Sequence, residues 1–140
     1  MNWAWYAVLS AFFGALVAIF GKIGVKGVDS NLAVAFRTAI IVFFAWGIVM
    51  VQGNASDLLR ISRHSFLFLF LSAIATGLSW LFYYKALQLG EASRVAPIDK
   101  LSVVLVAFFG VGFLGERLGA VNWIGILMIS AGAWLVTLRP

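Results

Sequence analysis

The stretch Ser93–Arg117 reads SRVAPIDKLSVVLVAFFGVGFLGER, and it decides the fold. It begins with a polar cluster that holds Pro97 and the adjacent charged residues Asp99 and Lys100. An apolar run from Leu101 to Leu114 follows, interrupted only by a serine and by glycines. Such a run predicts a membrane-spanning helix, and ionisable groups near its start are costly in hydrocarbon, so they indicate a functional role.

The composition of the whole chain indicates that its solvent is lipid. The 140 residues are 64% hydrophobic and 11% charged, and the mean hydropathy is +1.06. A soluble domain of this size could not bury so much apolar surface. The net charge of +5 is spread over the loops, which is typical of orientation signals and headgroup contacts rather than of a nucleic-acid site. The chain has no cysteine, which excludes disulfides and thiol chemistry.

The hydrophobic segments predict one all-α domain, residues 1–140, built as a bundle of five transmembrane helices. Each segment has about the 20 residues that a helix needs to cross the hydrocarbon. The predicted spans are about 3–21, 31–51, 65–86, 93–114 and 118–138. The turn Gly27–Ser30 can cap the second span, and Ser93 can cap the fourth. Pro97 either lies in the first turn of that span, where it costs little, or lies deeper and kinks the helix as a hinge.

Four residues in the second and third spans are candidates for contact with a substrate. Arg37 lies about two turns inside its span, where it either reaches back to the headgroups or meets a buried partner or substrate. Ser79, Trp80 and Tyr83 follow a belt of small and hydroxyl-bearing residues. These three side chains either serve packing and the interface or line a cavity, because Trp and Tyr combine an apolar body with a polar group.

The charges of the second and fourth spans are expected at the same depth. Arg37 comes six residues after Asn31, and Asp99 comes six residues after Ser93. We expect Arg37 and Asp99 to pair and to form, with Lys100, a net-positive polar vestibule that leads to a cavity. The alternative is that all three groups reach the headgroups. Asp99 is the acid nearest the membrane interior, so it is the candidate for coupling transport to protons.

An enzyme is not predicted, and neither a metal nor a cofactor is expected. Catalysis in a membrane would need a cluster of acids, bases or metal ligands. His64 is the single histidine and stands at the edge of a span, so it does not make a metal site.

Three strings resemble the EamA family of the drug/metabolite transporter superfamily. They are ASRVAPIDKL (Ala92–Leu101), LGERL (Leu114–Leu118) and WIGILMISAG (Trp123–Gly132). The resemblance covers essentially the whole chain and implies a transporter, with export of a small metabolite or drug-like solute by alternating access. Most members resemble two five-span units fused as an inverted repeat, so this chain looks like half of a ten-span transporter. The family also implies a multi-pass protein of a bacterial-type inner membrane.

The loop charges bear on orientation and on assembly. The membrane side that holds the N-terminus of the chain carries Arg60, Arg63 and Arg117. The side on which the second span starts carries Lys22, Lys26, Lys85, Arg94 and Arg139. This small excess favours an outside N-terminus and a cytoplasmic C-terminus. So small an excess also allows insertion in both orientations. The expected partners are membrane lipid, a small-molecule substrate and a second copy, in an antiparallel or a parallel homodimer. The alternative function is a non-transporting scaffold subunit that pairs with another membrane protein.

Overall fold

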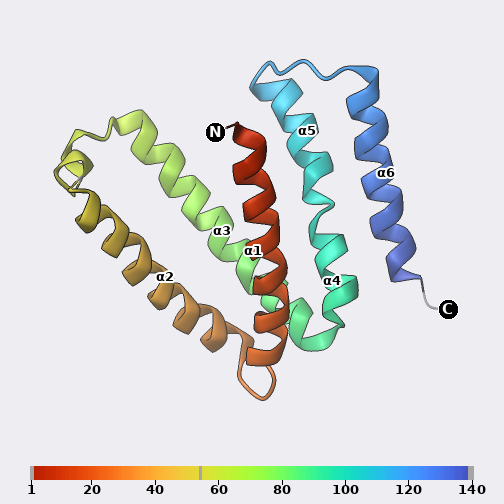
Figure 1. Cartoon of the computed structure of the whole chain (residues 1–140), viewed down its shortest axis with the longest axis horizontal. Helices are drawn as coiled ribbons and strands as arrows, with labels where there is room; N and C mark the ends of the chain where they lie inside the picture. Colours follow the sequence, from red (N-terminus) through yellow and green to blue (C-terminus); the bar gives the residue numbers. More distant parts are fainter. Residues whose placement is uncertain (1, 54, 139–140) are drawn as a thin grey trace. The chain divides into compact units, whose positions relative to one another are not determined.

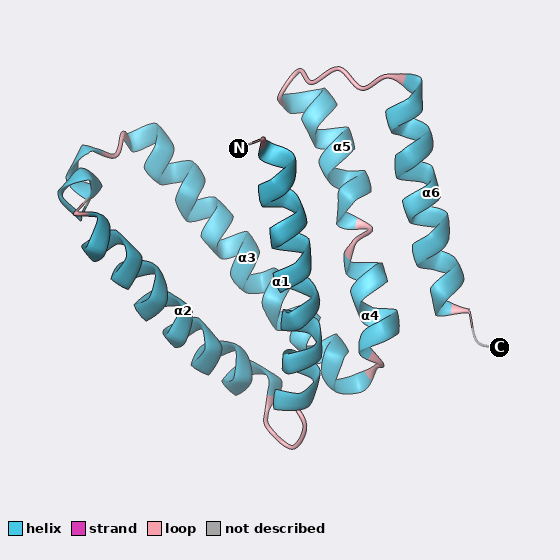
Figure 2. Cartoon of the chain, viewed as in Figure 1, coloured by secondary structure: helices cyan, strands magenta, loops and turns pink. Residues whose placement is uncertain are grey.

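The computed structural model describes residues 2–53 and 55–138, and every regular element in this part of the chain is a helix (Figures 1 and 2). The helices are α1 (Trp3–Gly24), α2 (Ser30–Gln52), the 3₁₀ helix η1 (Ala55–Arg60), α3 (Arg63–Leu89), α4 (Ala92–Asp99), α5 (Ser102–Phe113) and α6 (Ala120–Thr137). Five stretches are long and apolar enough to cross a membrane, with α4 and α5 forming one of them. The predicted all-α fold of five spans is therefore confirmed. Arg139, one of the loop charges counted above, lies outside the described residues.

The chain divides into two compact units. One unit is Phe20–Gln88, which holds the end of α1, then α2, η1 and nearly all of α3. Figure 1 shows α2 and α3 running in opposite directions and joined at one end through η1. The other unit combines Met1–Ile19 with Leu89–Pro140, and in it α6 contacts both α4 and α5.

The predicted capping turn lies before α2, and within it the structure shows that Asp29 is the capping residue. Asp29 Oδ1 accepts hydrogen bonds from the backbone N–H groups of Asn31, at 2.9 Å, and Leu32, at 3.0 Å. Gly27 has a φ of 78°, which a side chain would disfavour, and it lets the chain reverse before the cap. The first N–H groups of a helix have no partner within the helix, so this carboxylate satisfies two of them.

The start of α4 differs from the prediction that Ser93 caps it. The helix begins at Ala92, so Ser93 lies inside its first turn, and Glu91 occupies the capping position without a side-chain hydrogen bond. The Glu91 carbonyl accepts from the N–H groups of Arg94 and Val95, both at 3.0 Å. The Glu91 carboxylate also pairs with Arg94 Nε at 3.2 Å. A backbone carbonyl and an ion pair thus hold the first turn in place of the serine hydroxyl.

The fourth span is interrupted near its middle, shortly after Pro97. Pro97 lies inside α4, and the helix stops two residues later at Asp99. The N–H of Lys100 bonds the Pro97 carbonyl at 3.1 Å, and the N–H of Leu101 bonds the Ile98 carbonyl at 2.9 Å. Both bonds join residues that are three apart, as in a 3₁₀ helix, which is wound more tightly than an α-helix. Pro97 lies one turn before this break and, having no N–H, leaves the carbonyl four residues earlier without its helical partner.

Most large apolar side chains are exposed, and the buried core is small. Its members are mainly small residues or lie at the end of the bundle where α1 meets α3. The buried hydrophobic residues are Ala18, Val25, Val34, Tyr84, Leu87, Ala107 and Ala133. A membrane helix gains nothing by hiding Leu or Phe from lipid tails, so close contacts form through small residues. The exposed apolar surface is therefore lipid-facing surface.

Candidate functional site

The end of α1 packs closely on the end of α3 through Gly21. A Cβ on Gly21 would lie 3.0 Å from the Tyr84 hydroxyl oxygen and 3.3 Å from Leu87 Cδ1. The neighbouring Lys22 Nζ donates a hydrogen bond to the Leu87 carbonyl at 2.6 Å. A cation at the carboxyl end of a helix is favourable because the last carbonyls lack helical partners. These contacts hold Tyr84 in one position beside α1.

We expect Gly21→Val to lower the stability of the protein by about 1–3 kcal/mol, because overpacking forces a rigid ring to move. Gly24→Val is the matched control in the same helix, since a Cβ on Gly24 meets nothing within 4 Å. Thermal unfolding in a mild detergent compares the two variants. Equal stability of both variants would show that the close approach of the helices at Gly21 does not contribute to the stability of the protein.

Arg37 rests on two aromatic rings of α3. Its guanidinium carbon lies 4.3 Å from the centre of the Trp80 ring and 5.0 Å from the centre of the Tyr84 ring. Such contacts stabilise a guanidinium by about 0.5–2 kcal/mol, most where water is excluded. Arg37 is the eighth residue of α2, so it lies about 10 Å along the helix from its start. The rings thus hold a cation well inside the span.

Tyr84, rather than Tyr83, is the second aromatic residue that contacts Arg37. Trp80 and Tyr84 are four residues apart, and residues at this spacing share one side of a helix. That spacing could have identified Tyr84 from the sequence. Tyr83 is partly buried, and its ring centre lies 6.1 Å from that of Tyr84. Ser79 is exposed.

The other predicted charges lie at the break of the fourth span. Asp99 is the last residue of α4, and its Oδ2 lies 3.3 Å from Lys100 Nζ. The Asp99 side chain is 36% exposed and the Lys100 side chain 65% exposed. The break therefore places an ion pair and a 3₁₀ turn in one segment. The predicted pairing of Arg37 with Asp99 joins the two units and stays a prediction.

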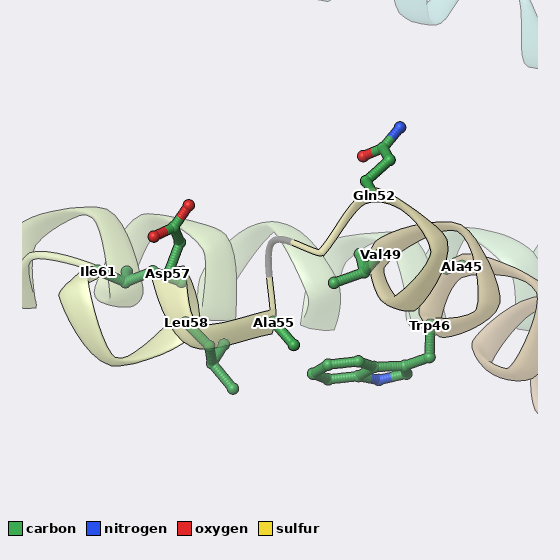
Figure 3. A pocket seen from close by; sticks show the side chains of 8 residues that line it. All are labelled: Ala45, Trp46, Val49, Gln52, Ala55, Asp57, Leu58 and Ile61. Carbon is green, nitrogen blue, oxygen red and sulfur yellow. The ribbon is translucent and has the colours of Figure 1, made fainter.

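A pocket lies at the other end of α2, where the chain turns into η1. It has a volume of about 420 Å³ and is mostly apolar. Figure 3 shows the Trp46 ring and Leu58 on the same side of the ribbon, with the Gln52 amide pointing away from them. The lining residues are Ala45, Trp46, Val49, Gln52, Ala55, Asp57, Leu58 and Ile61. The predicted substrate residues are not among them, so this pocket is separate from the Arg37 cluster.

The described residues hold no group of three or more His, Cys, Asp or Glu side chains that could bind a metal ion. The His64 ring packs on Phe68 in the first turns of α3, with ring centres 4.7 Å apart. This contact accounts for the histidine as an edge-of-span residue.

Comparisons with known proteins give one family and one close relative. The model of the EamA-like transporter family matches residues 1–138. A protein of Sinorhizobium sp. named "Uncharacterized transporter in cobO 3'region" is 49% identical over 135 residues, which is 96% of each chain. No solved structure matches the chain. The similarity therefore extends over nearly the whole of both chains.

Proposed function

The chain belongs to the EamA-like transporter family, and from that membership we propose that this membrane transporter exports a small solute by alternating access as a homo-oligomer. The family and the name of the relative point away from an enzyme. The solute would be a small metabolite or a drug-like molecule. The membrane would be the inner membrane of a bacterial-type cell, with the C-terminus in the cytoplasm as the preferred orientation.

The observation that carries this proposal is the broken fourth span with its charged pair. A 3₁₀ turn within a longer helix often marks a functional hinge. Charges within a span face the interior of the bundle or a water-filled cavity, because hydrocarbon does not solvate them. Many transporters bind substrate at discontinuous helices near the middle of the membrane. The Lys100–Leu101 break interrupts the span between α4 and α5, and it carries the Asp99–Lys100 ion pair.

The depth of Arg37 supports a shared vestibule. Arg37 comes seven residues after the start of α2, and Asp99 comes seven residues after the start of α4. Alternate spans cross in opposite directions, so the second and fourth spans start on the same side of the membrane. Arg37, Asp99 and Lys100 would then lie at similar depth and line the vestibule, with Trp80 beside them. Ser79 and Tyr83 would line the cavity that it leads to.

The single unit needs a second copy to form a complete transporter. Fused members of the family resemble two such units of opposite orientation, with the cavity between them. Two copies inserted in opposite orientations would restore that arrangement. A parallel dimer is the other homodimer that the chain can form, because identical surfaces can pair about a twofold axis.

Efflux from proteoliposomes tests the transport function directly. Vesicles loaded with a mixture of amino acids, nucleosides and carboxylic acids are incubated, and the external solutes are measured by mass spectrometry. We expect at least one solute to leave faster than from protein-free vesicles. Release equal to that of protein-free vesicles for every solute would favour the scaffold function instead.

Labelling of single cysteines tests the orientation. Asp29 caps α2 and Asp57 pairs with Arg60, so the exposed neighbours Lys26 and Ser56 are better sites on the two sides. In intact cells an impermeant thiol reagent is expected to label both Lys26→Cys and Ser56→Cys, each in about half of the molecules, because the charge bias is small. Labelling of Ser56→Cys alone would mean one fixed orientation with the C-terminus inside, and it would exclude the antiparallel dimer.

A further inference from the structure

The Arg37 guanidinium has a buried donor that the chain leaves without a partner. Among the described residues, Arg37 Nη1 is the buried side-chain nitrogen or oxygen for which no hydrogen-bond partner is found. Native proteins pair nearly all such groups, because a buried charged donor without an acceptor lowers the stability of the fold. This donor therefore points to an acceptor from outside the chain or from the other unit.

The surroundings of Arg37 decide which kind of acceptor fits. The Trp80 and Tyr84 rings attract the cation through their faces, but a ring does not replace a good acceptor for Nη1. A guanidinium presents its N–H groups in one plane as a fork, which matches the two oxygens of a carboxylate. A planar acceptor can approach along that edge while the rings stay in place.

The charge count favours an acceptor with a single negative charge. Within its unit, Arg37 is the cation that lies about two turns inside α2. The ammonium groups of Lys22 and Lys85 donate to the Leu87 carbonyl and to the Gln88 side chain at the end of α3. One guanidinium neutralises one charge. A phosphate dianion would leave a second charge uncompensated at a depth where an unpaired charge is expensive.

We propose that Arg37 binds the carboxylate of the transported solute, so that the substrate class is an organic monoanion with one carboxylate. This inference rests on the proposed transport function and deepens it. Tyr84 is a positioning residue: its ring supports the guanidinium, and its hydroxyl end is fixed against Gly21. Arg37 supplies the charge and the fork, and Trp80 supplies the second ring.

Calorimetric titration of the purified protein in phosphatidylcholine nanodiscs tests the proposal. Benzoate and butyrate are the carboxylate probes, benzamide is the neutral match, and phenyl phosphate is the dianionic match. We expect a carboxylate to bind at least about tenfold more tightly than benzamide and than phenyl phosphate, a difference of about 1.4 kcal/mol. Arg37→Gln should remove the binding. Arg37→Lys keeps the charge but loses the fork, so we expect a loss of about tenfold.

The control variant is Arg94→Gln, which removes an arginine that pairs with Glu91 at the start of α4. It should bind the carboxylates as the unchanged protein does. The proposal is overturned if neither carboxylate binds, if Arg37→Gln binds them equally well, or if phenyl phosphate binds more tightly. A phospholipid headgroup is the other source of an oxyanion. Carboxylate binding in a maltoside detergent that disappears in the nanodiscs would assign Arg37 to lipid phosphate and overturn the proposal.

The binding measurement is independent of transport. Binding that depends on Arg37, together with no efflux of any solute, would contradict the transport function and leave the carboxylate site standing. Efflux of a neutral solute, together with no carboxylate binding, would contradict the carboxylate site and leave the transport function standing.

Discussion

Proteoliposomes that contain Asp99→Asn are expected to release the transported solute at least about tenfold more slowly than those with the unchanged protein, which corresponds to about 1.4 kcal/mol in the barrier. Asparagine keeps the shape of aspartate but not its charge, so Lys100 loses the partner that lies 3.3 Å away at the break. If transport is coupled to protons, the variant also loses the group that would carry them. Efflux measured over time, with equal amounts of inserted protein, gives the result.

Asp57→Asn is the matched control, because Asp57 also pairs with a cation but lies exposed in η1, outside the spans. It is expected to release solute at the normal rate. Arg37→Gln should be as slow as Asp99→Asn. Normal release by both Arg37→Gln and Asp99→Asn would exclude the vestibule as the path of the solute.

A double-mutant cycle on Arg37 and Asp99 is expected to show a coupling energy of at least about 1 kcal/mol, as for residues in direct contact. Each single change, Arg37→Met or Asp99→Leu, removes one charge and leaves the other without its proposed partner. Such a charge is costly within a span, so the double variant should be more stable than the sum of the single changes predicts. Unfolding in mixed micelles measures the four stabilities.

The exposed pair of Asp57 and Arg60 provides the reference cycle. Its atoms are 3.5 Å apart and its side chains are 60% and 82% exposed, so its coupling should lie within about 0–1 kcal/mol. Strictly additive effects at Arg37 and Asp99 would show that the two residues do not meet. Asp99 would then pair with Lys100 alone. The proposed carboxylate site at Arg37 would be unaffected.

Prediction from the sequence worked best where the solvent decides the structure. The five apolar stretches predicted five spans because backbone groups in hydrocarbon must pair within a helix. The capping turn before α2 followed from local chemistry, and the structure selected Asp29 within it, since a short carboxylate reaches only the nearest N–H groups. Ser93 does not cap α4 because the helix already begins at Ala92, which places the serine inside the first turn.

Prediction of the site was less complete because contacts between helices depend on rotation about their axes. The sequence marked Arg37, Trp80 and Tyr83 as substrate candidates, and it did not predict that Tyr84 packs against the guanidinium. Neighbouring helical residues differ by about 100° in direction, so a shift of one position changes which ring meets the arginine. The four-residue spacing shows that Trp80 and Tyr84 share one side of α3, but it does not show that this side faces Arg37.

The sequence by itself determined the fold class, the five spans, the family strings and the presence of charge inside two spans. These properties follow from composition and from neighbours along the chain. Only the tertiary structure decided that the fourth span breaks at Lys100–Leu101, that Gly21 lets α1 approach Tyr84, and that Arg37 Nη1 is buried without a partner. The contacts of Gly21 and Arg37 depend on how helices far apart in the chain pack against each other. The break in the fourth span depends on which carbonyls the N–H groups of successive turns bond.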